Sequence, residues 1–319
     1  MTINEISIRP LRNEDLEEAD RIFRLSFGTF VGLPDPMEWY GDADYVRTRF
    51  KADPHAALGA EIDGELVGSN FAMNWGSVGV FGPLTVRPDL WDKGIAKRLL
   101  EGTMEIFARW GTKHVGLFTF AHSAKHINLY RKFGFWPWFL TAIMSKSVEQ
   151  RGNAFSQWSR YSEVPASKRE ESLTTCRNLT NTIYEGLDLK NEIHSVNTQQ
   201  LGDIVLLYEE DNVQLDGMAI CHCGAGTEGG SGTCYIKFGA VRPGPDSGQF
   251  FDNLLDACEA FAESQDMSRL VAGVSLGRRE AYSKMIARYF RTDMQGVAMH
   301  KPDEPGYNRS DTYVIDDWR

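Results

Sequence analysis

A strand, a glycine turn and a helix follow one another between residues 79 and 110, and this stretch constrains the fold most. The residues from 79 to 86 are mostly apolar, as in a buried strand. From Ile95 to Trp110, apolar side chains recur every three or four residues, which predicts a helix buried on a broad face. Gly94 stands at the helix start, where main-chain N–H groups lack partners and favour anions. The stretch therefore predicts a phosphate-binding turn.

A second strand and helix come later and complete a pattern. Residues 115–120 are apolar, and residues 123–135 read Ser-Ala-Lys-His-Ile-Asn-Leu-Tyr-Arg-Lys-Phe-Gly-Phe. Together the two stretches resemble the GNAT acetyltransferase superfamily. The family's phosphate loop reads Gln/Arg-x-x-Gly-x-Gly/Ala, and residues 91–96 follow it except for tryptophan at the first position. The family's second motif ends in Leu-Tyr-x-x-x-Gly-Phe, which residues 129–135 match, whereas Ser123 and His126 depart from its earlier positions.

The resemblance implies a fold, a co-substrate and a set of contacts. The fold is a mixed α/β sheet, and the co-substrate is acetyl-CoA. Tyr130 occupies the position at which the family carries its catalytic acid, and its phenol is a donor with a pKa near about 10. The implied cofactor-binding residues are Leu84, Thr85, Val86, Trp91, Asp92, Lys93, Gly94, Ile95, Ala96, Lys97 and Ser123.

The general base is less well defined than the acid. Acetyl transfer to an amine requires a neutral nitrogen, and the strand over residues 78–81 offers no carboxylate. His122 directly follows the second strand, and a histidine pKa near about 6.5 suits a base. The alternatives that remain open are a water chain to solvent and the carboxylates of Glu61, Glu38 and Asp42.

The remaining elements of the first half also follow from local patterns. A helix is expected from Asn13, with an acidic opening turn, and a short one at 45–50. Asp63-Gly64 predicts the turn of a hairpin over residues 56–71. The intervening segment 30–45 is rich in Gly, Pro, Asp and aromatic residues, and we expect it to be a surface segment that contacts the acceptor.

The second half of the sequence repeats the first. Residues 235–243 echo residues 81–88, and a Leu-Leu pair follows each Val-Arg-Pro triplet at the same distance. Such a repeat indicates duplication. A polar stretch over 148–172 separates the copies, so we predict a catalytic domain at residues 1–150 and a degenerate copy at 151–319.

The second copy lacks the residues on which the chemistry depends. Gly248 is one place out of register, Met285 replaces Tyr130, and Tyr289 replaces Gly134. We interpret this copy as a structural or substrate-shaping partner. Tandem copies with one degenerate half also resemble mycothiol synthase, and that resemblance would place the activity in the second half instead.

Composition and net charge narrow the range of partners, locations and metal sites that we expect. The 319 residues carry a net charge of −10, which disfavours nucleic acid as a partner and suits an amine substrate. The sequence starts without a basic, apolar leader and has no apolar run of membrane-spanning length. Five cysteines without a disulfide spacing favour a reducing cytoplasm. Cys221-His-Cys223 lacks a second ligand pair, so we expect no metal.

These observations lead to one functional hypothesis and one alternative. The hypothesis is an N-acetyltransferase that transfers acetyl from acetyl-CoA to a small-molecule amine by direct attack, without a covalent enzyme intermediate. Acceptor specificity is expected from residues 30–45 and from the seam between the copies. The alternative is a non-catalytic protein of this fold that binds acyl-CoA or a partner. The sequence assigns no acceptor and no oligomeric state.

Overall fold

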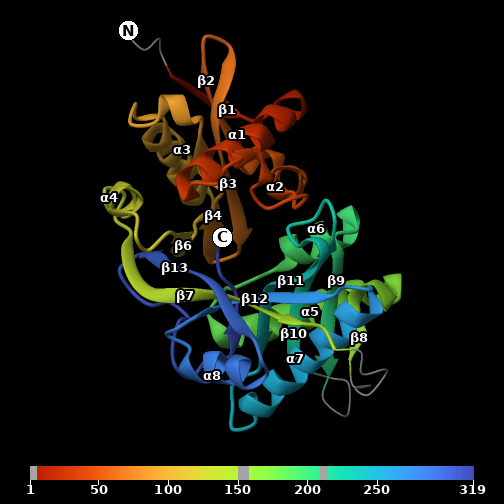
Figure 1. Ribbon diagram of the computed structural model, residues 1–319. Coiled ribbons are helices and arrows are strands. Elements are labelled where there is room, and N and C mark those ends of the chain that lie inside the picture. Colours follow the sequence, from red (N-terminus) through yellow and green to blue (C-terminus); the bar gives the residue numbers. More distant parts are fainter. Residues whose placement is uncertain (1–5, 150–157, 209–213) are drawn as a thin grey trace.

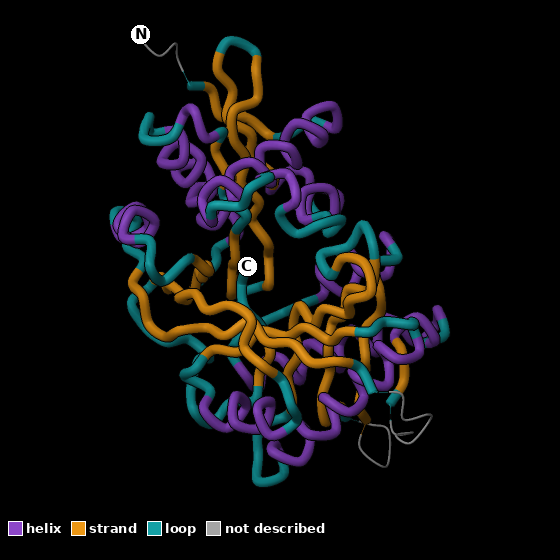
Figure 2. Tube along the Cα trace, viewed as in Figure 1, coloured by secondary structure: helices purple, strands orange, loops and turns teal. Residues whose placement is uncertain are grey.

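The strands form one 14-stranded sheet that runs through the whole molecule, with helices packed outside it (Figure 1, Figure 2). The computed structural model describes residues 6–149, 158–208 and 214–319. We call the residues before 150 the N-terminal half and those from 158 onward the C-terminal half. The predicted domain boundary after residue 150 lies outside the described residues. The expected mixed α/β fold is confirmed.

The two halves share their order of elements, with two exceptions. The N-terminal half contains β1 (Ser7–Pro10), α1 (Leu16–Val31), α2 (Tyr45–Ala52), β2 (Ala57–Ile62), β3 (Glu65–Trp75), β4 (Val78–Phe81), β5 (Thr85–Val86), α3 (Ile95–Trp110), β6 (His114–Thr119), α4 (Ala124–Arg131) and β7 (Trp136–Ser147). The C-terminal half contains β8 (Ser159–Arg160), α5 (Arg169–Ile183), α6 (Lys190–Gln199), β9 (Gly202–Tyr208), β10 (Leu215–Gly224), β11 (Gly230–Val241), α7 (Ser247–Ser264), β12 (Arg269–Ser275), α8 (Arg279–Ala287), β13 (Arg291–Lys301) and β14 (Val314–Ile315). Strands β4 and β5 of the first half correspond to the single strand β11 of the second, and β14 is added at the end of the second.

The elements predicted around the phosphate turn are present. Helix α3 begins directly after Gly94 and buries Ile95, Leu99 and Ile106, as its periodicity indicates. Strands β2 and β3 form the expected hairpin, and its turn residues Asp63 and Gly64 both have positive φ. The short helix expected at 45–50 is α2.

The segment from residue 30 differs from the expectation. Helix α1 continues through Phe30 to Val31, where Gly32 ends it with φ 76°. Gly28 allows the chain to return tightly over the helix, because a Cβ there would lie 2.3 Å from the carbonyl oxygen of Pro36. Phe30 therefore belongs to helix α1 and not to a surface loop. Tyr45 is also buried, as the first residue of α2.

The two halves exchange strands at the centre of the sheet. In the N-terminal half, β6 pairs with β4 on one side and with β13 of the other half on the opposite side. In the C-terminal half, β12 correspondingly pairs with β11 and with β7. Strands β7 and β13 pair with each other antiparallel, and they cross the middle of Figure 1. Each half thus completes its sheet with a strand from the other.

A buried seam joins the halves away from the exchanged strands. Trp75 of β3 packs in one apolar cluster with residues of α5, α6 and β9–β11. Beside it, Arg49 of α2 pairs with the Glu228 carboxylate at 2.9 Å, and Lys237 of β11 bonds to the same carboxylate. Glu192 accepts from the Trp75 indole at 3.0 Å and pairs with Lys237 at 3.1 Å. These paired charges tie α2 and β3 to the C-terminal half.

Each half contains a point where two parallel strands separate. In the N-terminal half, β4 and β6 pair only over Val78–Val80, and β5 then pairs with β3. In the C-terminal half, β11 and β12 pair over Thr233–Ile236. Beyond that point β14 pairs with β11, with Ala240 opposite Val314. The gap in the C-terminal half is therefore filled by the chain itself. Among the described residues, no helix has the length and apolar character of a membrane span.

Candidate functional site

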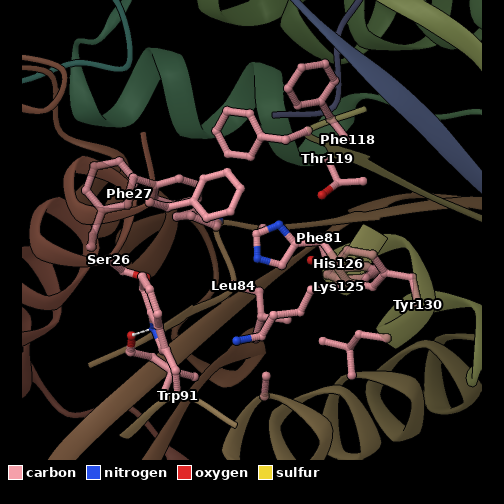
Figure 3. A pocket seen from close by; sticks show the side chains of 18 of the residues that line it. Ser26, Phe27, Phe81, Leu84, Trp91, Phe118, Thr119, Lys125, His126 and Tyr130 are labelled. Atoms are coloured by element: carbon pink, nitrogen blue, oxygen red, sulfur yellow. Dashed lines mark hydrogen bonds between the residues drawn. The ribbon is translucent and has the colours of Figure 1, made fainter. Parts of the chain in front are cut away.

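The gap between β4 and β6 in the N-terminal half opens into a cavity of about 680 Å³. Its walls come from α1, the loop before α2, the β4–β5 connection, the start of α3, β6 and α4. The last residues of the chain close one end, because Trp318 and Arg319 also line it. Figure 3 shows the side chains around this space. The cavity thus lies next to the predicted phosphate turn.

The phosphate turn has the geometry that the sequence predicts. Gly94 precedes the first residue of α3 and has φ 83°, a left-handed conformation that favours glycine. A Cβ at this position would meet nothing within 4 Å, so the space in front of the helix is open. The unpaired N–H groups of the first helical turn face such a space and carry the positive end of the helix dipole. The turn therefore fits a pyrophosphate group.

Trp91, which replaces the family's polar residue, fastens the phosphate loop to the neighbouring strand. Its indole N–H donates to the main-chain oxygen of Val86 at 2.7 Å, the bond drawn in Figure 3. Lys125 of α4 lies over the Trp91 ring, 5.4 Å from its centroid, and pairs with Asp92 at 2.8 Å. The substitution therefore couples the loop to α4.

Most of the predicted cofactor-binding residues line the cavity, and three do not. The lining includes Leu84, Val86, Trp91, Asp92, Gly94, Ile95, Ala96 and Lys97. Thr85 is instead buried against Ser69, with 3.2 Å between the hydroxyl oxygens. The Ser123 hydroxyl caps α4 by accepting from the His126 N–H, and the Lys93 side chain is exposed on the loop.

Tyr130 lies on α4 with its side chain buried in the lining of the cavity (Figure 3). Its ring contacts Phe81 edge-on at 5.9 Å between centroids. Burial raises the pKa of Tyr130 above that of a free phenol, because the phenolate would lose its hydration. The hydroxyl therefore stays protonated at neutral pH and is able to donate.

The histidine that lines the cavity is His126 rather than the predicted His122. His122 is exposed and stacks on Phe30 from outside the lining, at 5.8 Å between ring centroids. His126 lies in the middle of the view in Figure 3 and contacts Phe30 at 4.8 Å. Desolvation, with smaller contributions from Lys125 and His122, lowers the pKa of His126. One sequence signal was available, because His126 and Tyr130 are four residues apart and so share a helix face.

None of the three alternative carboxylates lines the cavity. Glu61 pairs with Arg9 at 2.7 Å, and Asp42 accepts from the Ser231 N–H at 2.8 Å across the seam. Glu38 is exposed on the loop before α2. Of the described lining residues, Asp92 is the one with a carboxylate side chain, and Lys125 already pairs with it.

Aromatic side chains form most of the end of the cavity opposite the phosphate turn. The segment 30–45 contributes several of them, and helix α1 and the region of strand β6 add further rings. The aromatic residues at this end are Phe27, Phe30, Trp39, Tyr40, Tyr45, Phe118 and Phe120. Phe27 stacks on Trp39 with 5.8 Å between centroids and 11° between planes. The apolar side of α1 indicated its buried residues but not that Phe27 and Phe30 face a cavity.

The chain's last residues reach this site from the C-terminal half. The main-chain oxygen of Arg319 accepts from Arg49 at 2.5 Å, and the Arg319 guanidinium stacks on Tyr235 at 4.2 Å. The Trp318 indole N–H donates to the Tyr307 hydroxyl at 2.9 Å. These contacts hold the tail in a fixed place. No motif in the sequence pointed to them.

The start of α7 in the C-terminal half corresponds to the turn before α3, but it has different residues. Asp246, not glycine, precedes α7, and Gly248 lies within the first turn of that helix. A Cβ at Gly248 would already lie 3.3 Å from the Tyr313 hydroxyl. The Tyr313 ring contacts Phe251 of α7 at 5.4 Å. Side chains thus fill the space that is open in front of Gly94.

The Cys-His-Cys sequence of β10 lies mostly buried in the C-terminal half. The described residues contain no group of three or more His, Cys, Asp or Glu side chains arranged to hold a metal ion. His222 is buried beside Tyr235, and Cys221 packs in the apolar cluster beneath α7.

Comparison with known proteins agrees with this geometry. The model of the acetyltransferase (GNAT) family matches residues 16–135. A proposed acetyltransferase from Pyrococcus horikoshii has a TM-score of 0.70 at 14% identity, over 100% of this chain and 96% of its own. A GCN5-related N-acetyltransferase from Sphaerobacter thermophilus has a TM-score of 0.56 at 14% identity, with coverages of 93% and 95%.

A tandem GNAT protein from the clavulanic acid biosynthesis pathway is also similar over both halves. Its TM-score is 0.56 at 10% identity, and the alignment covers 93% of this chain and 98% of that protein. At these identities the likeness concerns the fold. No curated protein matched the sequence. The family match shows that residues 16–135 form an acetyltransferase (GNAT) family domain, and the open glycine turn lies within it.

Proposed function

We propose that the protein is an N-acetyltransferase that uses acetyl-CoA to acetylate the amine of a small molecule. The observation that supports it most is the open turn at Gly94 beside a cavity that contains Tyr130 and His126. GNAT proteins generally transfer acyl groups, and this domain has the glycine turn and a tyrosine at the position where the resemblance implies the acid. The C-terminal half would serve as a structural partner, because side chains and β14 fill its corresponding space.

The residues divide between holding the co-substrate and moving protons. The first turn of α3 would hold the pyrophosphate, and Lys97 and Lys125 in the lining add positive charge. Acetyl-CoA supplies the acetyl group as a thioester. In this proposal Tyr130 would donate a proton to the leaving sulfur, because burial keeps its hydroxyl protonated. His126, kept neutral by burial, would accept the proton that leaves the amine nitrogen.

Variants of two glycines test the proposal that the turn at Gly94 binds CoA. Gly94→Trp should raise the dissociation constant for CoA by at least about 100-fold, because a side chain there would fill the space the pyrophosphate needs. Gly111→Trp is the matched control. Gly111 ends the same helix, also has positive φ and also has nothing within 4 Å of its Cβ position.

Titration calorimetry with CoA compares the two variants with the wild-type protein. Equal losses of affinity in both variants would contradict the assignment of the turn. The chemical half is tested by thiol release from acetyl-CoA with a panel of amines. CoA binding without release on any amine would favour the alternative, a non-catalytic acyl-CoA-binding protein.

A further inference from the structure

The acceptor end of the cavity has aromatic walls on several sides. Phe27 and Phe30 project from α1, Phe118 from β6, and Phe120 from the position directly after the end of β6. The rings of Phe30 and Phe120 lie 4.8 Å apart, and Trp39 stacks on Phe27 from the loop side. Rings held by one another in this way offer flat apolar faces to a ligand. A planar ring is the ligand shape that such walls fit best.

The charged side chains of the lining leave no free carboxylate side chain for an ammonium group. The cationic lining residues are Lys97, Lys125, Lys132 and Arg319, in a chain whose overall charge is negative. Asp92 is the one carboxylate side chain of the described lining, and it belongs to the phosphate loop and pairs with Lys125. Lys97 and Arg319 are also paired, with Glu101 and Asp317. A protonated amine would therefore find no free side-chain carboxylate in the described lining.

The proton acceptor in the cavity is also a weak one. Burial lowers the pKa of His126, so it binds protons less readily than a free histidine. An alkylamine with a pKa near about 10.4 has roughly one molecule in 2,500 unprotonated at pH 7. A base weaker than free histidine does little to shift that equilibrium. The site therefore favours an amine that is already neutral in water.

We propose that the acceptor is an arylamine, with its amino group directly on an aromatic ring that carries an oxygen substituent. Delocalisation of the nitrogen lone pair into the ring keeps such an amine unprotonated at pH 7. The inference rests on the proposed acetyltransferase function and specifies its substrate class.

Two buried polar groups of the lining are the reason for proposing an oxygen substituent on the ring. The Tyr45 hydroxyl and the Trp39 indole N–H are shielded from water and have no hydrogen-bond partner among the described residues. Burying such groups unpaired is costly, and a ligand oxygen would satisfy the indole donor. The Tyr45 hydroxyl is able either to donate to that oxygen or to accept from it. Both residues belong to the aromatic end of the cavity.

The reaction balances without a further reactant. The amine nitrogen forms a bond to the acetyl carbon, and the bond from that carbon to sulfur breaks. The nitrogen loses one proton, which His126 accepts, and the sulfur gains one proton, which Tyr130 provides. Tyr130 then recovers its proton through solvent as His126 releases one. The products are an aryl acetamide and free CoA thiol.

A matched pair of acceptors tests the inference with the wild-type protein. The amino group of 4-methoxyaniline lies directly on the ring, whereas that of 4-methoxybenzylamine lies one methylene away and is strongly basic. With acetyl-CoA at pH 7, the aniline should have the higher kcat/KM by at least about tenfold. Its value should stay flat from pH 7 to 8, while that of the benzylamine rises about tenfold per pH unit. Free thiol release measures both.

A variant pair tests whether the aromatic wall holds the ring. Phe30→Leu should raise KM for 4-methoxyaniline about fivefold and leave the dissociation constant for CoA unchanged. Phe133→Leu is the control, because Phe133 is equally half-buried and lies outside the described lining. Its KM should match that of the wild type. A change in KM of the same size in both variants would contradict a role for this wall.

The outcomes separate this inference from the function on which it rests. If CoA does not bind, both fail. If CoA binds and the benzylamine or an aliphatic diamine is acetylated at pH 7 as fast as the aniline, or faster, only the arylamine inference fails. Turnover of no arylamine by a protein that binds CoA also overturns it. Preferred turnover of the aniline, with the flat pH profile, supports it.

Discussion

The two strand gaps of this molecule lie at corresponding places in the two halves but are occupied differently. In the N-terminal half, β4 and β6 separate beside a left-handed glycine, and an aromatic cavity opens between them. In the C-terminal half, the corresponding gap holds β14, and Tyr313 stands before the helix. A parallel pair that separates leaves main-chain groups without partners. The contrast teaches that such a gap requires an occupant, either a ligand or a segment of the chain.

The largest expected difference between the two gaps lies in catalysis. Tyr130→Phe keeps the ring and removes the donor, so turnover should fall by about 10²–10⁴-fold with little change in the dissociation constant for CoA. Met285 is the residue at the same place in the C-terminal repeat and is fully buried. Met285→Leu should leave turnover intact. Steady-state rates with a confirmed acceptor measure both, and a decrease below about threefold for Tyr130→Phe would remove it from the mechanism.

The next largest effect concerns the contacts that hold β14 in the gap of the C-terminal half. Arg278 is buried and bonds to Asn308 at 2.9 Å, to the Val314 carbonyl and to Asp316, all in or beside the tail that carries β14. Arg278→Met leaves the buried Asp316 carboxylate without its cation, which should cost about 3–5 kcal/mol of stability. Urea denaturation measures the loss.

A neighbouring arginine provides the control for this experiment. Arg279 begins α8 and, as a surface side chain, should tolerate the same change to methionine within about 0.5 kcal/mol. A small effect at Arg278 would mean that the tail is not fixed in the gap, and the contrast between the halves would then weaken.

The smallest expected effect comes from a variant that tests whether the gap in the C-terminal half can be opened to CoA. Tyr313→Ala removes a half-buried ring that packs on Phe251, and should cost about 1 kcal/mol. Because β14 still pairs with β11, we expect calorimetry to find one CoA site per chain, as in the wild type. A second site in this variant would show that Tyr313 alone closes the C-terminal copy.

Local sequence patterns predicted many of the elements on which this comparison rests. The periodicity from Ile95 to Trp110 predicted α3, and the glycine before it predicted the open turn, because both depend on neighbouring residues. The repeat also predicted the order of elements in the C-terminal half. The exchange of β7 and β13 was not predictable in this way, since alternation shows that a segment is a strand but not which strand it pairs with.

The part of the site that was missed depends on contacts between distant residues. Strand β14 spans only Val314–Ile315, too short for a period, and the residues after it meet Arg49 from the far end of the chain. His122 was predicted as the base from its position directly after a strand, and the spacing of four residues between His126 and Tyr130 was not used.

The strand exchange also sets the order in which the protein can be completed on the ribosome. Strand β6 pairs with β13, in a register that places Thr119 opposite Val297. At about 5–20 residues per second, synthesis reaches β13 roughly 10–35 s after β6 has been made. During that interval β6 and β7 present unpaired edges, which are sites where other chains can add. A nascent chain of this design therefore depends on the arrival of its last strands, or on a chaperone, to stay unaggregated.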